Sequence, residues 1–198
     1  MKNNQRLLTL ISMMIALSFL FMYFEFPIPI LFPAYLKIDP SDIPALFTGL
    51  FIGPFPALVI ELGKNILHAM FNMKEANFSG EIANFSYGVA FILPVSIFAS
   101  VLKAKMKTWN NKQFMIRFIP FFVLGIILST IVMSFVNYYI TFPLYGMNDH
   151  TVKIAGIISG TPFNIFKGVL ITIVSYLLYT PLKKMFDRYF NRVSMKLK

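Results

Sequence analysis

The sequence contains no cysteine and few charged residues. The lack of cysteine excludes disulfides, cysteine nucleophiles and thiolate metal sites. Charged residues make up 13% of the 198 residues and hydrophobic residues 57%, whereas soluble domains carry about 25% charged residues. This composition is typical of a membrane protein, in which each spanning helix uses roughly 20 apolar residues. The length therefore allows one bundle of at most six spans over residues 1–198, without a separate folded domain.

Motifs for nucleotide hydrolysis and for intramembrane proteolysis are also absent. Gly63-Lys64 is followed by Asn65, and Leu58 stands where a phosphate loop needs its first glycine. Around Ser159 the Gly-x-Ser-Gly pattern of intramembrane serine proteases is incomplete, and the two histidines are isolated from each other. We therefore expect a protein that is not an enzyme and that carries no cofactor or metal.

The apolar runs predict an all-α fold, a bundle of six transmembrane helices. The first run, 7–26, is longer than the core of a cleavable signal peptide, so we expect it to be retained as the first helix. The other helices are expected at about 43–52, 56–71, 80–101, 118–140 and from 154 or 161 to 182. The links between them are expected at 72–79, at the basic stretch 103–117 and at 143–153.

A proline-rich segment joins the first two expected helices. Prolines at positions 27, 29, 33 and 40 are too many for a helix interior. Residues 27–40 are therefore predicted to form a stiff, partly apolar outer loop. The next helix is expected to start with Ser41 or Asp42 as its N-cap and Pro44 in its first turn.

The basic residues are distributed unevenly over these links. With six spans, 13 of the 18 Lys and Arg residues lie on the same side as both termini, and the positive-inside rule assigns that side to the cytoplasm. The net charge of +10 is then a topology signal that also suits contact with anionic lipid, and not a nucleic-acid surface. The 13 residues are Lys2, Arg6, Lys103, Lys105, Lys107, Lys112, Arg117, Lys183, Lys184, Arg188, Arg192, Lys196 and Lys198.

Polar side chains inside the expected spans are costly and therefore informative. Asn84, Asn137, Asn164 and Lys167 come from three helices and reach one depth, about one or two turns from the outer end. Asparagine offers donors and an acceptor to a heteroaromatic edge, and lysine offers donors to oxygen atoms. A single buried Asn more often bonds a neighbouring helix, but four polar side chains beneath a stiff loop favour a ligand site.

A second polar group lies on the expected helix 56–71. Glu61, Lys64, Asn65 and His68 fall within one broad face. They suit a proton or ion relay, which would make the chain a solitary proton-coupled carrier. The alternative, which we favour, is an ion pair between Glu61 and Lys64 at i,i+3, with His68 near the outer interface.

Five segments resemble the riboflavin-specific S component of energy-coupling factor (ECF) vitamin transporters. They are 36–46, Gly53-Pro54, 61–65, 80–85 and 164–167, and the resemblance extends in order over nearly the whole chain. It implies a multi-pass subunit of a bacterial cell membrane, with both termini cytoplasmic, that captures riboflavin from outside. It also implies a transmembrane T component and two cytoplasmic ATPase subunits as partners. An S component for thiamine or pantothenate would fit the topology equally well.

The resemblance further implies roles for individual residues. Those expected to bind the vitamin are Asn84, Asn137, Asn164, Lys167, Leu36, Lys37, Asp39 and Glu81. Ser12 and Ala16 match an Ala-x-x-x-Ala pattern that packs against the T component, because small residues permit close approach of helices. We expect the loop 27–40 to order over the bound vitamin, and replacement of Lys167 or Asn164 by Ala to weaken flavin binding more than folding.

Overall fold

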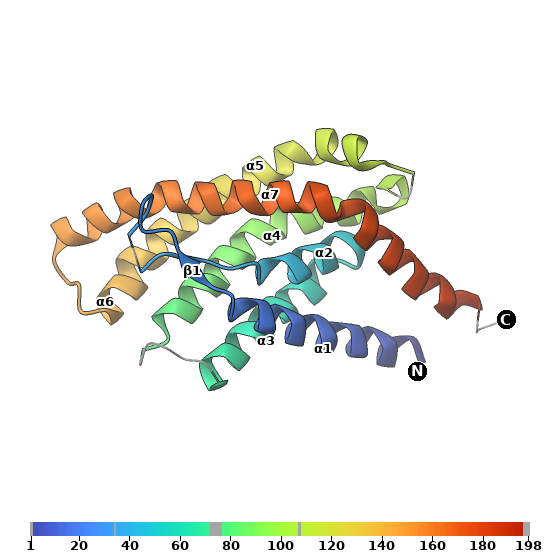
Figure 1. The fold of residues 1–198 in the computed structure, drawn as a ribbon, viewed down its shortest axis with the longest axis horizontal. Helices are drawn as coiled ribbons and strands as arrows, with labels where there is room; N and C mark the ends of the chain where they lie inside the picture. Colours follow the sequence, from blue (N-terminus) through green and yellow to red (C-terminus); the bar gives the residue numbers. More distant parts are fainter. Residues whose placement is uncertain (1, 34, 72–76, 107, 196–198) are drawn as a thin grey trace.

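The computed structural model describes residues 2–33, 35–71, 77–106 and 108–195 (Figure 1). The expected all-α class is confirmed, since these residues form long helices and only two strands, β1 (Phe26–Pro27) and β2 (Lys37–Ile38), of two residues each. The helical elements are α1 (Lys2–Met22), α2 (Asp42–Phe51), α3 (Pro54–Phe71), α4 (Ser79–Met106), α5 (Asn111–Val136), the π-helical η1 (Asn137–Thr141), α6 (Phe142–Leu144) and α7 (His150–Met195).

Four helical segments among the described residues are long and apolar enough to cross a membrane. They are Gln5–Met22, Ser79–Met106, Asn111–Leu144 and His150–Tyr189. The apolar helix α2 has only 10 residues, and the 18-residue α3 carries charged side chains along its buried face. The chain is thus a helical membrane protein, whereas the count of six spans stays a prediction.

Several helix boundaries differ from those expected. Helix α4 continues to Met106, and α5 begins at Asn111 and not at 118, so much of the basic stretch expected as a link is helical. The cause is a capping box, in which the Asn110 side chain accepts from the backbone N–H of Gln113 and the Gln113 side chain accepts from that of Asn110. Helix α7 runs from His150 to Met195 and incorporates Pro162 and Pro181.

The segment between α1 and α2 contains a short antiparallel ladder. Helix α1 ends at Met22 and not at Phe26, because Phe26 pairs with Ile38 and Pro27 with Lys37. The Lys37 side chain also donates to the Glu25 carboxylate at 3.2 Å. Phe32, between the two strands, contacts α7, where its ring lies 5.4 Å from the Phe163 ring.

Both chain ends and the link between α4 and α5 lie at the same end of the bundle (Figure 1). The structure therefore gathers the described basic residues at the end of α4, at the start of α5 and in the C-terminal part of α7 at the end of the bundle where α1 begins, whereas Lys153 and Lys167 lie in the first half of α7. Lys107, Lys196 and Lys198 of the predicted basic group lie outside the described residues, as do the side chains of Lys2 and Arg192. Residues 72–76 of the expected polar link also lie outside them.

Helix α7 is the longest element and bends near its second proline (Figure 1). Asp149 precedes it and accepts from the backbone N–H groups of Thr151 and Val152, which holds the pKa of that carboxyl below its usual range. Pro181 lacks the N–H of a regular helix, and its ring displaces the preceding turn. Beyond it the Tyr189 hydroxyl donates to the carbonyl of Arg6 in α1 at 2.8 Å, and the buried Phe186 packs against Phe51 of α2.

Candidate functional site

A cavity of about 150 Å³ lies at the end of the bundle opposite the chain termini. Its walls come from the end of α1, the strand β2, the starts of α4 and α7, and the turns that follow α5. The structure brings all eight residues predicted to bind a ligand to this cavity: Leu36, Lys37, Asp39, Glu81, Asn84, Asn137, Asn164 and Lys167. Residues far apart in the sequence thus form one concave site.

Lys167 lies at the base of the cavity and is held by two carboxylates. Its Nζ is 3.0 Å from Asp42 Oδ2 and 3.4 Å from Asp39 Oδ2, and the residue is 4% exposed. The same Nζ lies 4.7 Å from the centre of the Tyr87 ring, within the range of a cation–π contact. An ammonium group so deeply buried is retained in its charged form only because these partners surround it.

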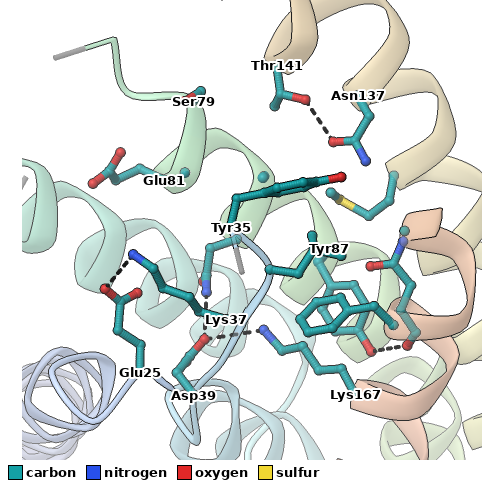
Figure 2. A pocket seen from close by; sticks show the side chains of 18 of the residues that line it. Glu25, Tyr35, Lys37, Asp39, Ser79, Glu81, Tyr87, Asn137, Thr141 and Lys167 are labelled. Carbon is teal, nitrogen blue, oxygen red and sulfur yellow. Dashed lines mark hydrogen bonds and ion pairs between the residues drawn. The ribbon is translucent and has the colours of Figure 1, made fainter. Parts of the chain in front are cut away.

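Asp39 joins three elements of the site (Figure 2). Its Oδ1 accepts from the backbone N–H of Ser41, while its Oδ2 accepts from Asn84 of α4 at 3.1 Å and from Lys167 of α7. Asn84 in turn accepts from Asn65 of α3 at 3.5 Å. Both ends of the Asn84 amide are therefore engaged, so Asn84 holds Asp39 in place as well as lining the cavity.

Glu81 supplies an acceptor at the other side of the cavity. Its Oε1 lies 2.8 Å from His68 Nδ1, whereas its Oε2 is buried and has no hydrogen-bond partner among the described residues. A buried oxygen without a partner costs free energy unless a ligand donor reaches it. Glu81 is therefore suited to accept a hydrogen bond from a ligand hydroxyl.

Behind the cavity, five charged side chains of alternating sign form a buried ion-pair chain in the order Asp39, Lys167, Asp42, Lys64 and Glu61. Lys64 pairs with Asp42 and, at 2.9 Å, with Glu61. The predicted ion pair between Glu61 and Lys64 is thus confirmed. His68 contacts Glu81 and is separate from the ion-pair chain. All five side chains are at most 5% exposed, and charges buried to this extent are stable only when they are paired in this way.

Several site residues were not predicted from the sequence. Tyr87 is 3% exposed and donates to the backbone carbonyl of Asn164 at 3.1 Å; its only signal is its place three residues after Asn84, on the same face of α4. Thr141 and Tyr35 also line the cavity. Ser41 stands at the expected N-cap position of α2, but its side chain makes no cap hydrogen bond and accepts instead from Lys64.

The two small residues predicted on the first helix lie on its outer face. Ser12 and Ala16 are both exposed, next to the exposed Met13 and Leu17. This face of α1 is therefore open to another helix. Among the described residues no group of three or more His, Asp or Glu side chains could hold a metal ion.

Comparisons with known proteins agree with this architecture. The family model for the ECF transporter, substrate-specific component, matches residues 6–179. The chain is 37% identical to riboflavin transporter RibU of Staphylococcus aureus, over 95% of each chain. It is 34% identical to riboflavin transporter FmnP of Bacillus subtilis, over 89% of this chain and 91% of the relative. A solved S component of a bacterial ECF transporter superposes with a TM-score of 0.72 at 36% identity, covering 92% of this chain and 98% of that one.

Proposed function

Because the chain belongs to the family of substrate-specific components of ECF transporters, we propose that it binds riboflavin in the cavity between β2, α4, η1 and α7. The observation that carries this proposal is the convergence of the eight predicted binding residues on that cavity. Residues 1–198 then act as one membrane-embedded substrate-binding domain. The relatives are named as transporters, so the chain is a transport subunit and not an enzyme.

The chemistry of the cavity suits this vitamin. Riboflavin has a flat tricyclic ring with polar edges and a hydroxylated side chain, so its site needs apolar walls and a few directed polar groups. Phe163, Met133 and Tyr35 supply apolar surface around the cavity. Lys167 supplies a donor for ring oxygens, and the unpaired oxygen of Glu81 supplies an acceptor for a side-chain hydroxyl.

The segment 27–40 is the proposed lid of the site. The two-residue ladder and the ion pair between Lys37 and Glu25 hold the two ends of this segment together. Phe32 covers α7 beside the cavity through its contact with Phe163. Asp39 anchors the end of this segment to Asn84 and Lys167, so the part between the two strands is the part that opens to the outside and orders over the bound vitamin.

Transport requires partners, because this chain has no phosphate loop. We place the basic end of the bundle, with both termini, in the cytoplasm. A transmembrane T component would pack on the outer face of α1 at Ser12 and Ala16, and two ATPase subunits would drive the release of riboflavin to the inside. The exposure of these small residues supports a helix packing there.

A binding assay tests the proposed function directly. Detergent-purified protein from a flavin-containing host is expected to be yellow, and the protein freed of flavin is expected to quench the fluorescence of added riboflavin. Colourless protein that leaves riboflavin fluorescence unchanged, while it quenches with or retains another vitamin, would assign the cavity to that vitamin.

Liposomes that contain this chain alone separate the proposal from the proton-carrier alternative. We expect the chain to bind riboflavin but not to accumulate it, with or without a pH gradient, because the energy source is on other subunits. Accumulation that follows the pH gradient and is lost in Glu61→Gln would support the solitary carrier instead. The ion pair between Glu61 and Lys64 supports a structural role of this group.

Filling the cavity from Gly160 is expected to block binding without disturbing the fold. A Cβ placed on Gly160 meets no heavy atom within 4 Å, and the residue lines the cavity. The side chain of Gly160→Leu would therefore extend into the ligand space. We expect riboflavin binding to weaken at least about tenfold, which corresponds to a loss of about 1.4 kcal/mol of binding free energy. The replacement Ile158→Ala, on the exposed side of the same helix, is the matched control and is expected to leave affinity unchanged.

A further inference from the structure

The π-helical turn η1 lies beside the cavity, between α5 and α6. Its defining hydrogen bond runs from the N–H of Phe142 to the carbonyl of Asn137, five residues earlier. Pro143 follows directly, and its ring would clash with the carbonyl four residues back in a regular helix. The wider turn accommodates this proline, and single π turns occur frequently at functional sites.

Within this turn Thr141 makes an unusual hydrogen bond. Thr48, Thr130, Thr161 and Thr172 each donate to the backbone carbonyl four residues earlier in their helix. Thr141 instead donates to the side chain of the residue four positions earlier, with its Oγ1 2.7 Å from Asn137 Oδ1. The backbone carbonyl of Asn137 accepts from the N–H of Phe142, while the side-chain oxygen of Asn137 accepts from the Thr141 hydroxyl.

In this hydrogen bond the Thr141 hydroxyl donates and the side-chain oxygen of Asn137 accepts. An asparagine side chain can place either its oxygen or its NH₂ group at a given point after a rotation of 180°. Here the oxygen faces Thr141, and the amide nitrogen points into the cavity (Figure 2). Thr141 is 3% exposed, so water cannot readily replace its hydroxyl. Asn137 therefore presents a donor to the ligand.

We propose that Thr141 is a positioning residue for the ligand site, which fixes Asn137 as a hydrogen-bond donor and so selects an acceptor on the ligand. This inference rests on the proposed function and specifies the hydrogen bond that Asn137 makes with the ligand. In riboflavin the group facing Asn137 is a carbonyl oxygen or an unprotonated nitrogen of the ring system, and not the ring N–H. Asn137 and Lys167 then form a donor side of the cavity, opposite the acceptor of Glu81.

Variants at position 141 test this inference in the full-length detergent-purified protein. Thr141→Val keeps the shape of the side chain but lacks the hydroxyl, and we expect riboflavin binding, measured by fluorescence quenching, to weaken about tenfold. Thr141→Ser retains the hydroxyl and is expected to bind within about twofold of the unmodified chain. Equal affinity of the Val variant and the unmodified chain would overturn the inference.

A double-mutant cycle shows whether Thr141 acts through Asn137. Asn137→Ala removes the positioned amide, so adding Thr141→Val is expected to cause no further loss of affinity. Additive losses would overturn the inference, because they would mean that the Thr141 hydroxyl acts independently of Asn137.

The variant Asn137→Asp gives an independent test that does not alter Thr141. Its carboxylate can still accept from Thr141 but offers oxygen, not NH₂, to the cavity, so we expect a loss of more than about tenfold. Unchanged affinity would overturn the donor assignment. If the unmodified chain itself does not bind riboflavin, the proposed function is refuted and this inference with it, whereas binding by that chain isolates the role of Thr141.

Discussion

Replacing Lys167 by Met is expected to abolish riboflavin binding and to lower the free energy of unfolding by about 3–5 kcal/mol. The ammonium group pairs with Asp42 and Asp39, which are 0% and 5% exposed. Methionine would leave the buried Asp39 without a cation and Asp42 with Lys64 as its remaining cation, and it would remove a donor from the cavity. Binding would be measured by quenching of riboflavin fluorescence, and stability by thermal unfolding in detergent.

Two further variants separate the effects of Lys167 on binding and on folding. Lys184→Met removes an exposed charge at the other end of the same helix and is expected to change neither property. Adding Asp39→Asn to Lys167→Met removes one unpaired carboxylate while its amide oxygen can still accept from Ser41. We expect this pair to regain stability but not riboflavin binding. A folded Lys167→Met protein with unchanged affinity would contradict the site assignment.

The structure separates the expected effects of replacing Asn164 and Lys167 by Ala. Asn164 carries no charge, and its backbone carbonyl is the group that pairs with Tyr87. Its replacement by Ala still should weaken binding more than folding. Replacing Lys167 also removes its ion pairs with Asp39 and Asp42 and so destabilises the fold. The loss of riboflavin affinity in a Lys167 variant must therefore be measured on the folded fraction.

Replacing Lys64 by Met is expected to destabilise the fold by about 3–5 kcal/mol as well, but with a smaller effect on affinity. Lys64 is 0% exposed and pairs with Asp42 and Glu61, yet it does not line the cavity. The folded fraction of Lys64→Met should therefore bind riboflavin with an affinity closer to that of the unmodified chain. Glu61 would lose its cation in this variant, whereas Asp42 would keep Lys167, so adding Glu61→Gln should recover part of the stability.

An unchanged unfolding temperature in Lys64→Met would show that the ion-pair chain does not support the fold. The matched control is Lys153→Met, because Lys153 lies over the Tyr138 ring at the start of α7 and has no carboxylate partner among the described residues. That variant is expected to unfold within a few tenths of a kcal/mol of the unmodified chain.

The polar part of the site could be predicted because polar side chains stand out in apolar runs. Asn137, Asn164 and Lys167 were placed at one depth from their positions in helices, and they line one cavity in the structure. The loop residues Leu36, Lys37 and Asp39 came only from the resemblance to the S component. Their position depends on a two-residue ladder that has no periodic signal in the sequence.

Other parts of the site have no such signal. The chain contains 23 Phe and 9 Tyr residues, so nothing in the composition distinguishes Tyr87 from other aromatic core residues. Asp42 precedes an apolar run, where an acidic residue normally indicates a helix cap, and its ion pairs depend on lysines 22 and 125 residues away in the chain. The π turn at Asn137 depends on packing around Pro143, which helical periodicity does not show.

The bend of α7 at Pro181 keeps the end of a helix that is longer than the bilayer core in contact with the bundle. If straight, this 46-residue helix would extend about 69 Å, more than twice the roughly 30 Å of a bilayer's hydrocarbon core. The part beyond the bend instead returns to the bundle, where Phe186 covers Phe51 and Tyr189 bonds the first turns of α1. It therefore braces the first and second helices from outside, and a chain cut at Pro181 would leave an aromatic surface uncovered and the start of α1 unsupported.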